Sequence, residues 1–288
     1  MTYLQVLING LALGGLYACI AAGFSLVWGV LNIINLLHGS LIVLGAYLAY
    51  FAHQAWGISP FVFAPAAGLA LFLPAFLIQR TILERVMGKP VLATLILTFG
   101  LNLFLDNAML YGFKADFRKV IFDPPLGLLD LGGVLLPLDR FYATVAGLAL
   151  VLAVWALLRT THFGRAIVAV RMDREAAALM GIEVPRTYAL AFALGAFMAG
   201  AAGSLLSGIF PISPVASSLY LGKAFVICVL GGLGSLPGVI AGGFALGLIE
   251  SFGTLALGPE LALTVAFVLL ILLLMFRPTG LLGRQGFQ

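Results

Sequence analysis

Long, uninterrupted apolar runs constrain this chain more than any other feature of its sequence. A helix that crosses the hydrocarbon core of a membrane needs roughly 20 mostly apolar residues, and runs of that length follow one another along the 288 residues. Hydrophobic residues make up 62% of the chain and charged residues 9%, whereas a soluble domain is about 45–50% apolar. The runs are continuous, whereas the strands of a membrane β-barrel alternate. The sequence therefore predicts an all-α, polytopic transmembrane helical bundle.

We expect about eight membrane segments in a single domain that occupies residues 1–288. The run at 222–256 is too long for one simple crossing and is interrupted by GGLGSLPG. Proline lacks the N–H that the helical ladder requires, and glycines weaken a helix. This run should therefore be broken or re-entrant, with the interruption at Gly231, Gly232, Gly234, Pro237 and Gly238. The expected spans are residues 3–30, 32–52, 61–79, 91–111, 141–158, 187–210, 223–256 and 261–276.

Basic residues in short loops mark the cytoplasmic side of a membrane protein. The 80–90 loop carries three Lys or Arg and the 159–186 loop carries five. We therefore place both loops in the cytoplasm, the N-terminus outside, and 112–140 as an external loop. A cytoplasmic C-terminal tail then requires 222–256 to return to the side on which it started. The net charge of +4 follows from this loop pattern and does not indicate nucleic acid binding.

Polar residues inside the apolar runs are candidates for a translocation path, because such groups usually face the bundle interior or a water-filled cavity. Asn32, Asn35 and His38 are spaced three apart, so they are expected to share one helical face. Gly39 follows His38 directly, and Asn102 lies in the fourth span. The alternative role for these side chains is hydrogen bonding between helices, which stabilises a bundle without touching a solute.

Two carboxylates, Asp106 and Glu250, also lie within or near the apolar runs. Either of them could relay protons, which leaves an ion-coupled secondary transporter or channel as an alternative function. No second His or Cys stands at ligand spacing, so no metal site is expected. The sequence has neither a G-x-x-x-x-G-K-[ST] loop nor a recognisable nucleophile motif, so we expect no cofactor and no enzymatic activity.

Small residues spaced four apart let helices approach each other closely. Such spacing predicts tight packing within the bundle and says nothing about a solute. The pairs are Gly10 and Gly14, Gly195 and Ala199, and Gly243 and Gly247.

The most charged stretch of the chain, GRAIVAVRMDREAAALMGIEV at 164–184, lies between two apolar runs. Asp173 is a good N-cap, and Glu175 in the first turn suits the helix dipole. The alanines that follow favour a helix, and Gly181 is the residue type that ends one. The resulting helix is about two turns long, which is too short to be stable alone. We therefore expect it to be held by packing against something outside the membrane.

This short helix resembles a known motif. Glu175, Ala176 and Ala177, with Gly181 four residues further on, match the E-A-A-x-x-x-G pattern of bacterial ABC-importer permeases. Longer stretches resemble branched-chain amino acid permeases of the LivH type, and they cover residues 29–50, 163–205, 229–250 and 276–284.

The first of these stretches carries the family's I-N-x-x-H-G segment at Asn35, His38 and Gly39. The chain departs from the family pattern nearby. The residue after His-Gly is often acidic in the family, whereas here it is Ser40. Leu36 and Leu37 replace the family's usual aromatic and small residues.

The resemblance implies a permease subunit of an ABC importer that moves a small, branched-chain amino acid across the bacterial inner membrane by ATP-driven alternating access. The implied partners are cytoplasmic ABC ATPase subunits, a second permease subunit of the LivM type, an external solute-binding protein and the lipid bilayer. The 159–186 loop would then be the cytoplasmic coupling loop, with ATPase-coupling residues Arg171, Asp173, Glu175, Ala176, Ala177 and Gly181. A transporter without an ATPase, and a structural membrane subunit without a path, remain the alternatives.

Overall fold

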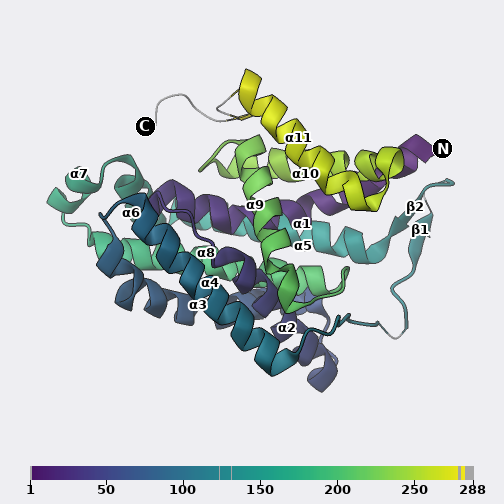
Figure 1. The fold of residues 1–288 in the computed structure, drawn as a ribbon, viewed down its shortest axis with the longest axis horizontal. Coiled ribbons are helices and arrows are strands. Elements are labelled where there is room, and N and C mark those ends of the chain that lie inside the picture. Colours follow the sequence, from purple (N-terminus) through teal and green to yellow (C-terminus); the bar gives the residue numbers. More distant parts are fainter. Residues whose placement is uncertain (1, 123, 131, 278–279, 283–288) are drawn as a thin grey trace.

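The fold is an elongated bundle of helices with one small hairpin of strands (Figure 1). The computed structural model describes residues 2–122, 124–130, 132–277 and 280–282. The expected all-α membrane bundle is confirmed, since eight of the described helical segments are long and apolar enough to cross a membrane. The elements are α1 (Thr2–Leu31), α2 (His38–Trp56), α3 (Pro60–Thr81), η1 (Leu83–Val86), α4 (Val91–Phe113), β1 (Leu128–Asp130), β2 (Leu135–Pro137), α5 (Leu138–Thr160), α6 (His162–Met172), α7 (Arg174–Leu179), α8 (Val184–Ser207), η2 (Pro214–Ala216), α9 (Ser217–Gly231), α10 (Leu236–Leu257) and α11 (Pro259–Phe276).

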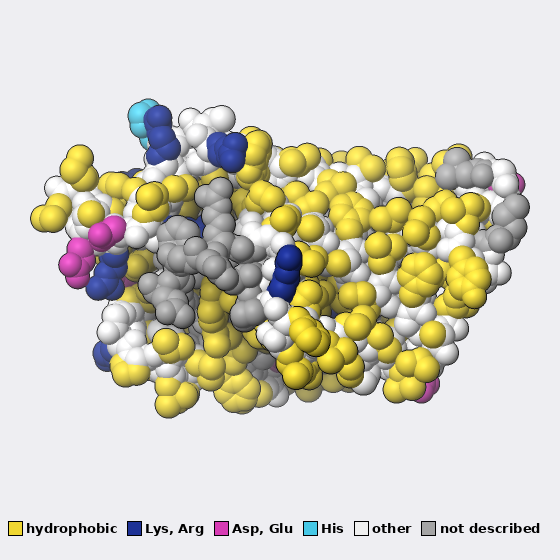
Figure 2. Space-filling model, turned by 90° about the horizontal axis from the view of Figure 1, so that it is seen from above, with side chains coloured by type: hydrophobic (Ala, Val, Ile, Leu, Met, Phe, Trp, Pro, Cys, Tyr) yellow, Lys and Arg dark blue, Asp and Glu magenta, His cyan; other side chains and the backbone are white. Residues whose placement is uncertain are grey.

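Helices α1 and α8 form the core. In the most apolar stretch of 18 residues in each helix, 94% and 89% of the stretch is buried inside the protein. The outer helices are α3, α4, α5 and α11. In the most apolar stretch of each of these helices, no more than 28% is buried inside the protein. Hydrophobic side chains therefore cover much of the outer surface, as Figure 2 shows for one face. In a protein that spans a membrane, such a surface contacts lipid rather than water.

Glycines allow the central helices to approach each other closely. A Cβ atom added at Gly10 would lie 2.9 Å from the carbonyl oxygen of Gly247, and one added at Gly14 would collide with the ring of Phe244 in α10. A Cβ at Gly195 would lie 3.0 Å from the carbonyl oxygen of Gly23. The expectation of tight packing at these small residues is confirmed, since their backbones occupy the space that side chains would fill.

The expected second span at 32–52 begins too early, and this prediction was wrong. Helix α1 continues to Leu31, Asn32 adopts a positive φ of 53°, and α2 begins only at His38. Asn tolerates the left-handed conformation better than other non-glycine residues, so it can end a helix. Asn32, Asn35 and His38 therefore do not share a helical face.

The expected interruption at 231–238 is confirmed. Helix α9 ends at Gly231, and Gly232 and Gly234 have φ values of 103° and 74°. The next helix has Pro237 in its first turn, and the Ser235 side chain accepts a hydrogen bond from the Gly238 N–H at its start. The long run thus forms two helices, and α9 runs across α1 and α10 in Figure 1. At the turn the backbones of α9 and α10 are in contact through Gly231 and Gly238.

The 112–140 connection carries the antiparallel hairpin β1–β2, in which Leu129 pairs with Leu136. The side chain of Gln5 ties this hairpin to α1, since its Oε1 accepts from the Leu135 N–H at 2.9 Å and its Nε2 donates to the Leu135 carbonyl at 2.6 Å. Figure 1 shows the hairpin and the N-terminus at one end of the molecule and α6 and α7 at the other. Residues 278, 279, 283 and 284 of the family-like 276–284 segment lie outside the described residues.

Candidate functional site

The loop between α5 and α8 forms two helices at one end of the molecule. Thr161 caps α6 by accepting a hydrogen bond from the Gly164 N–H at 3.0 Å, and α6 buries Gly164, Ile167 and Val170. Sequence reasoning missed this helix, although the apolar residues at a spacing of three indicate an amphipathic helix. Charged side chains gather mainly at this end of the face drawn in Figure 2.

Helix α7 has the two ends that the sequence predicts. The Asp173 carboxylate accepts from the N–H groups of Glu175 and Ala176, both at 2.9 Å. At the other end Gly181 has a φ of 83° and donates to the Ala178 carbonyl, while the Ile182 N–H donates to the Ala177 carbonyl. This pair of hydrogen bonds is a Schellman motif. The capping role of Asp173 and the terminating role of Gly181 are confirmed, while their role in coupling stays a prediction.

The outer side of α7 presents large apolar side chains. Leu179 is 88% exposed and Met180 is 83% exposed, whereas Ala177 is buried. Glu175 and Ala176 are also exposed, on the side of the helix away from the bundle. Exposed apolar side chains of this kind are candidates for contact with another protein or with the membrane.

Arg171 connects this loop to the interruption between α9 and α10. Its guanidinium donates to the Gly234 carbonyl at 2.7 Å, and a Cβ at Gly29, near the end of α1, would lie 3.6 Å from the guanidinium carbon. Burial lowers the pKa of the Arg171 guanidinium from its usual range. The side chain therefore joins three elements of its own chain, and its role includes holding the turn at Gly234.

A second polar site lies inside the apolar body, where α2, α4 and the start of α9 meet. The Ser40 hydroxyl lies 2.6 Å from Asp106 Oδ1 and 2.5 Å from Asn102 Oδ1. The other carboxylate oxygen, Asp106 Oδ2, accepts from the Ser217 hydroxyl at 2.7 Å and from the Asn102 amide at 3.1 Å. We call Ser40, Asn102, Asp106 and Ser217 the Asp106 cluster.

The Asp106 cluster gives the departure at Ser40 a structural meaning. Ser40 is one of the positions at which a departure from the family pattern was expected, and its hydroxyl contacts the Asp106 carboxylate. Sequence reasoning named Asn102 and Asp106 but missed Ser40 and Ser217 as their partners, because serines in apolar helices carry no spacing signal.

The predicted path residues lie at different distances from this cluster. His38 is fully buried, with its Nε2 2.9 Å from the Ile20 carbonyl oxygen. Gly39 lies against the Ser217 backbone, where a side chain would not fit. Asn35 is buried in the segment before α2, and Asn32 is exposed at the end of α1. Of the predicted path residues, Gly39 and Asn102 therefore lie at the Asp106 cluster, whereas Asn32 does not.

Glu250 lies in a separate group of charged and polar side chains. The Lys223 ammonium is 2.8 Å from Glu250 Oε1 and donates to Oε2 at 3.0 Å, and both side chains are 13% exposed. The Tyr17 hydroxyl donates to the same carboxylate and accepts from Lys223 at 3.0 Å. The sequence does not predict Lys223 as a partner of Glu250. Lys223 stands at the edge of an apolar run, where a charged residue usually marks only the boundary of a span.

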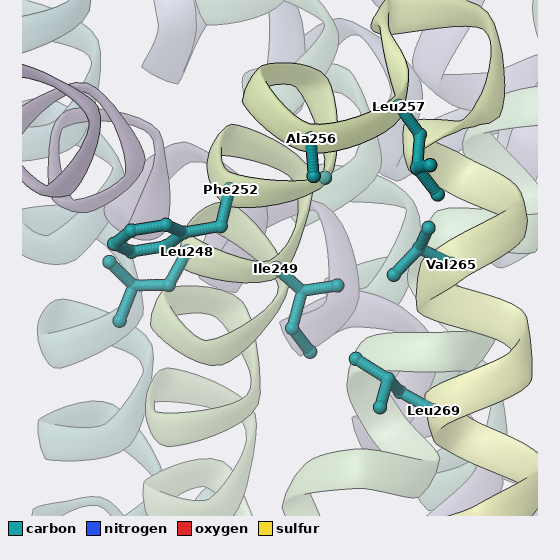
Figure 3. Close-up of a pocket in the computed structure, with 8 residues that line it drawn as sticks. Leu248, Ile249, Phe252, Ala256, Leu257, Val265 and Leu269 are labelled. Carbon is teal, nitrogen blue, oxygen red and sulfur yellow. The ribbon is translucent and has the colours of Figure 1, made fainter. Parts of the chain in front are cut away.

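A hollow of about 370 Å³ opens between α10 and α11 (Figure 3). Leu248, Ile249, Phe252, Ala256 and Leu257 line it from α10, and Val265 and Leu269 from α11. All of these side chains are apolar, so the hollow offers no group that could recognise the charged ends of a solute. Among the described residues, no group of three His, Cys, Asp or Glu side chains could hold a metal ion.

Comparison with known proteins identifies the family of the chain. Residues 6–275 match the model of the family described as "Branched-chain amino acid transport system / permease component". The chain belongs to this family. It is therefore a multi-pass membrane permease and not an enzyme.

Curated relatives match the permease over nearly its whole length. The high-affinity branched-chain amino acid transport system permease protein BraD of Pseudomonas aeruginosa is 34% identical over 295 residues, which cover 98% of this chain and 96% of the relative. LivH of Escherichia coli strain K12 is also 34% identical, with 98% and 96% covered. LivM of Salmonella typhimurium is 28% identical, with 93% of this chain and 68% of the relative covered. Among solved structures, none matches the permease at a significant level.

Proposed function

We propose that this chain is the permease subunit of an ABC importer that carries a branched-chain or other small amino acid across the bacterial inner membrane. Cytoplasmic ATPases drive the transport by alternating access, and an external solute-binding protein delivers the solute. A second permease subunit of the LivM type completes the membrane part. The observation that carries this proposal is the family match over residues 6–275, together with relatives whose names describe branched-chain amino acid permeases.

The geometry of α7 supports a docking role for the 159–186 loop in the cytoplasm. A helix of six residues is too short to be stable alone, yet this one is capped at both ends and exposes Leu179 and Met180. An ATPase groove that binds these side chains would hold α7 and receive its motion. The 112–140 connection, at the other end of the molecule, is the corresponding external loop for the binding protein.

The contacts of Arg171 supply a route for that motion into the membrane. Coupling requires an element with two arrangements that both sites can bias. Displacing α6 moves the guanidinium that holds the Gly234 carbonyl, and the turn at Gly234 joins α9 to α10. We propose that the α9–α10 turn moves together with α5 and α8 when the ATPases close.

Ion-coupled transport without an ATPase is less favoured. The carboxylate of Glu250 is paired with Lys223 and accepts from Tyr17, so it is not a free relay group. One nitrogen of His38 is bound to the Ile20 carbonyl. The named relatives are permease components of transport systems, in which the permease is one part.

Purification with reconstitution tests the proposed function. The tagged chain, isolated in mild detergent, should carry an ATPase and a second permease that mass spectrometry identifies. Proteoliposomes containing this assembly should take up radiolabelled leucine only with the binding protein outside and ATP at the ATPases. Uptake by the purified chain alone, without ATP, would overturn the proposal in favour of a secondary transporter.

A further inference from the structure

Asp106 is a carboxylate at membrane depth whose partners are all uncharged. In the part of the chain that the structure describes, the ion pairs are Arg80 with Glu183 and Lys223 with Glu250. Asp106 is in neither pair, and it bonds instead to two hydroxyls and an amide from three different helices. An ionisable residue inside a membrane span is costly, so one without a cationic partner points to a function.

The surroundings orient this carboxylate and leave it accessible. Ser40 is in the first turn of α2 and Ser217 is the first residue of α9, and the N-terminal ends of helices favour a nearby anion. The two hydroxyls orient the two carboxylate oxygens. Asp106 and Asn102 are only partly buried, and a partly open carboxylate in a span faces a water-filled path or another subunit rather than lipid.

We propose that Asp106 receives the ammonium group of the amino acid as it passes through the membrane, with Ser40, Asn102 and Ser217 as its positioning residues. This inference rests on the proposed function, since it names the group of the solute that the path itself recognises. A zwitterionic amino acid carries the cation that the Asp106 cluster lacks. The ammonium group can donate three hydrogen bonds, and one of them can go to Asp106 Oδ1, whose single partner in the cluster is the Ser40 hydroxyl.

The position of α9 relates this site to the cytoplasmic loop. Helix α9 begins at Ser217 in the Asp106 cluster and ends at the turn where Arg171 holds the Gly234 carbonyl. A movement of that turn therefore shifts a hydroxyl that orients Asp106. The affinity for the ammonium group then differs between the two states of the transporter, as alternating access requires.

The first test compares Asp106→Asn with Asn107→Ala in the complete reconstituted transporter. Asn107 lies next to Asp106, is exposed, and bonds only within its own helix, to the Leu103 carbonyl. Leucine uptake should fall by about 30-fold or more in Asp106→Asn, since the charged partner of the ammonium group is lost, and should not change in Asn107→Ala. ATP hydrolysis stimulated by the binding protein is measured in both variants and should stay close to wild type in Asn107→Ala, which leaves both the Asp106 cluster and the coupling loop untouched.

A second variant moves the charge instead of removing it. Since the Ser40 hydroxyl lies 2.6 Å from the carboxylate, Ser40→Asp combined with Asp106→Ser returns a carboxylate to the same place from α2. Uptake in this double variant should recover well above that of Asp106→Ser alone. Recovery would show that uptake requires a carboxylate at this place and not an aspartate on α4 in particular.

Three results would overturn the inference. Wild-type uptake in Asp106→Asn would show that the charge is not used. A parallel loss of uptake, ATP hydrolysis and thermal stability would assign Asp106 to the structure of the bundle. Uptake by the wild type that requires Na⁺, with the requirement lost in Asp106→Asn, would identify a metal cation as the occupant. Failure of the proposed function is separate, because wild-type uptake would then be independent of ATP.

Discussion

Replacing Gly181 by valine is expected to abolish the stimulation of ATP hydrolysis by the loaded binding protein while leaving insertion into the membrane intact. No atom lies within 4 Å of a Cβ built at this position, so the effect arises from the backbone and not from a clash. The φ of 83° is a left-handed conformation, which costs an L-residue about 1–2 kcal/mol. A six-residue helix cannot absorb that cost, so α7 loses its Schellman end and its docking surface.

Asparagine is the matched control for this position, because its side chain tolerates positive φ better than other non-glycine residues. We expect activity to decrease in the order Gly181, Gly181→Asn, Gly181→Ala, Gly181→Val. ATP hydrolysis and leucine uptake by proteoliposomes, normalised to the inserted permease, measure the series. Equal activity in the valine variant would contradict a coupling role for α7.

Replacing Lys223 by methionine is expected to destabilise the permease by about 3–5 kcal/mol, the cost of leaving one partner of a buried ion pair uncompensated. The two side chains are only 13% exposed, so water cannot take the place of the ammonium group. Glu250 would keep the Tyr17 hydroxyl as a donor, but its negative charge would be unbalanced within the bundle. The midpoint of thermal unfolding in detergent and the yield of folded protein measure the loss.

The double variant Lys223→Met with Glu250→Gln separates this explanation from a loss of packing. Both charges are then absent, and the glutamine amide oxygen can still accept from Tyr17. Stability should recover most of the way to wild type, since a buried ion pair can be replaced by uncharged residues at little cost. A double variant as unstable as Lys223→Met alone would contradict the assignment of the effect to the unpaired carboxylate.

The general architecture could be predicted from the sequence, because length and apolar character decide which segments span a membrane. The interruption at Gly231–Gly238 was predictable as well, since glycines and a proline disfavour a continuous helix wherever the helix packs. The start of α2 could not be predicted, because Asn32 can either continue a helix or end it in the left-handed conformation. That choice depends on tertiary packing, which holds residues 33–35 outside any helix before a turn at 36–37 leads into α2 at His38.

The candidate site shows the same division between local and long-range information. Asp173 and Gly181 act on the backbone within a few residues, so their roles as cap and terminator follow from residue type and spacing. The contacts of Asp106 with Ser40 and Ser217 join residues 66 and 111 positions apart. No periodicity predicts which serine faces which carboxylate, and the same applies to the pairing of Lys223 with Glu250.

Cross-linking from Leu179→Cys tests most directly the claim that α7 is where this permease meets its ATPase. Leu179 is 88% exposed at the end of α7, and the native Cys19 and Cys228 are buried, so the new thiol is the accessible one among the described residues. Phe117→Cys, 77% exposed in the predicted external loop, is the matched control. The account predicts that a short bifunctional maleimide joins Leu179→Cys to the ATPase in membranes of the assembled transporter, and does not join Phe117→Cys to it. An ATPase adduct from Phe117→Cys, or none from Leu179→Cys, would contradict it.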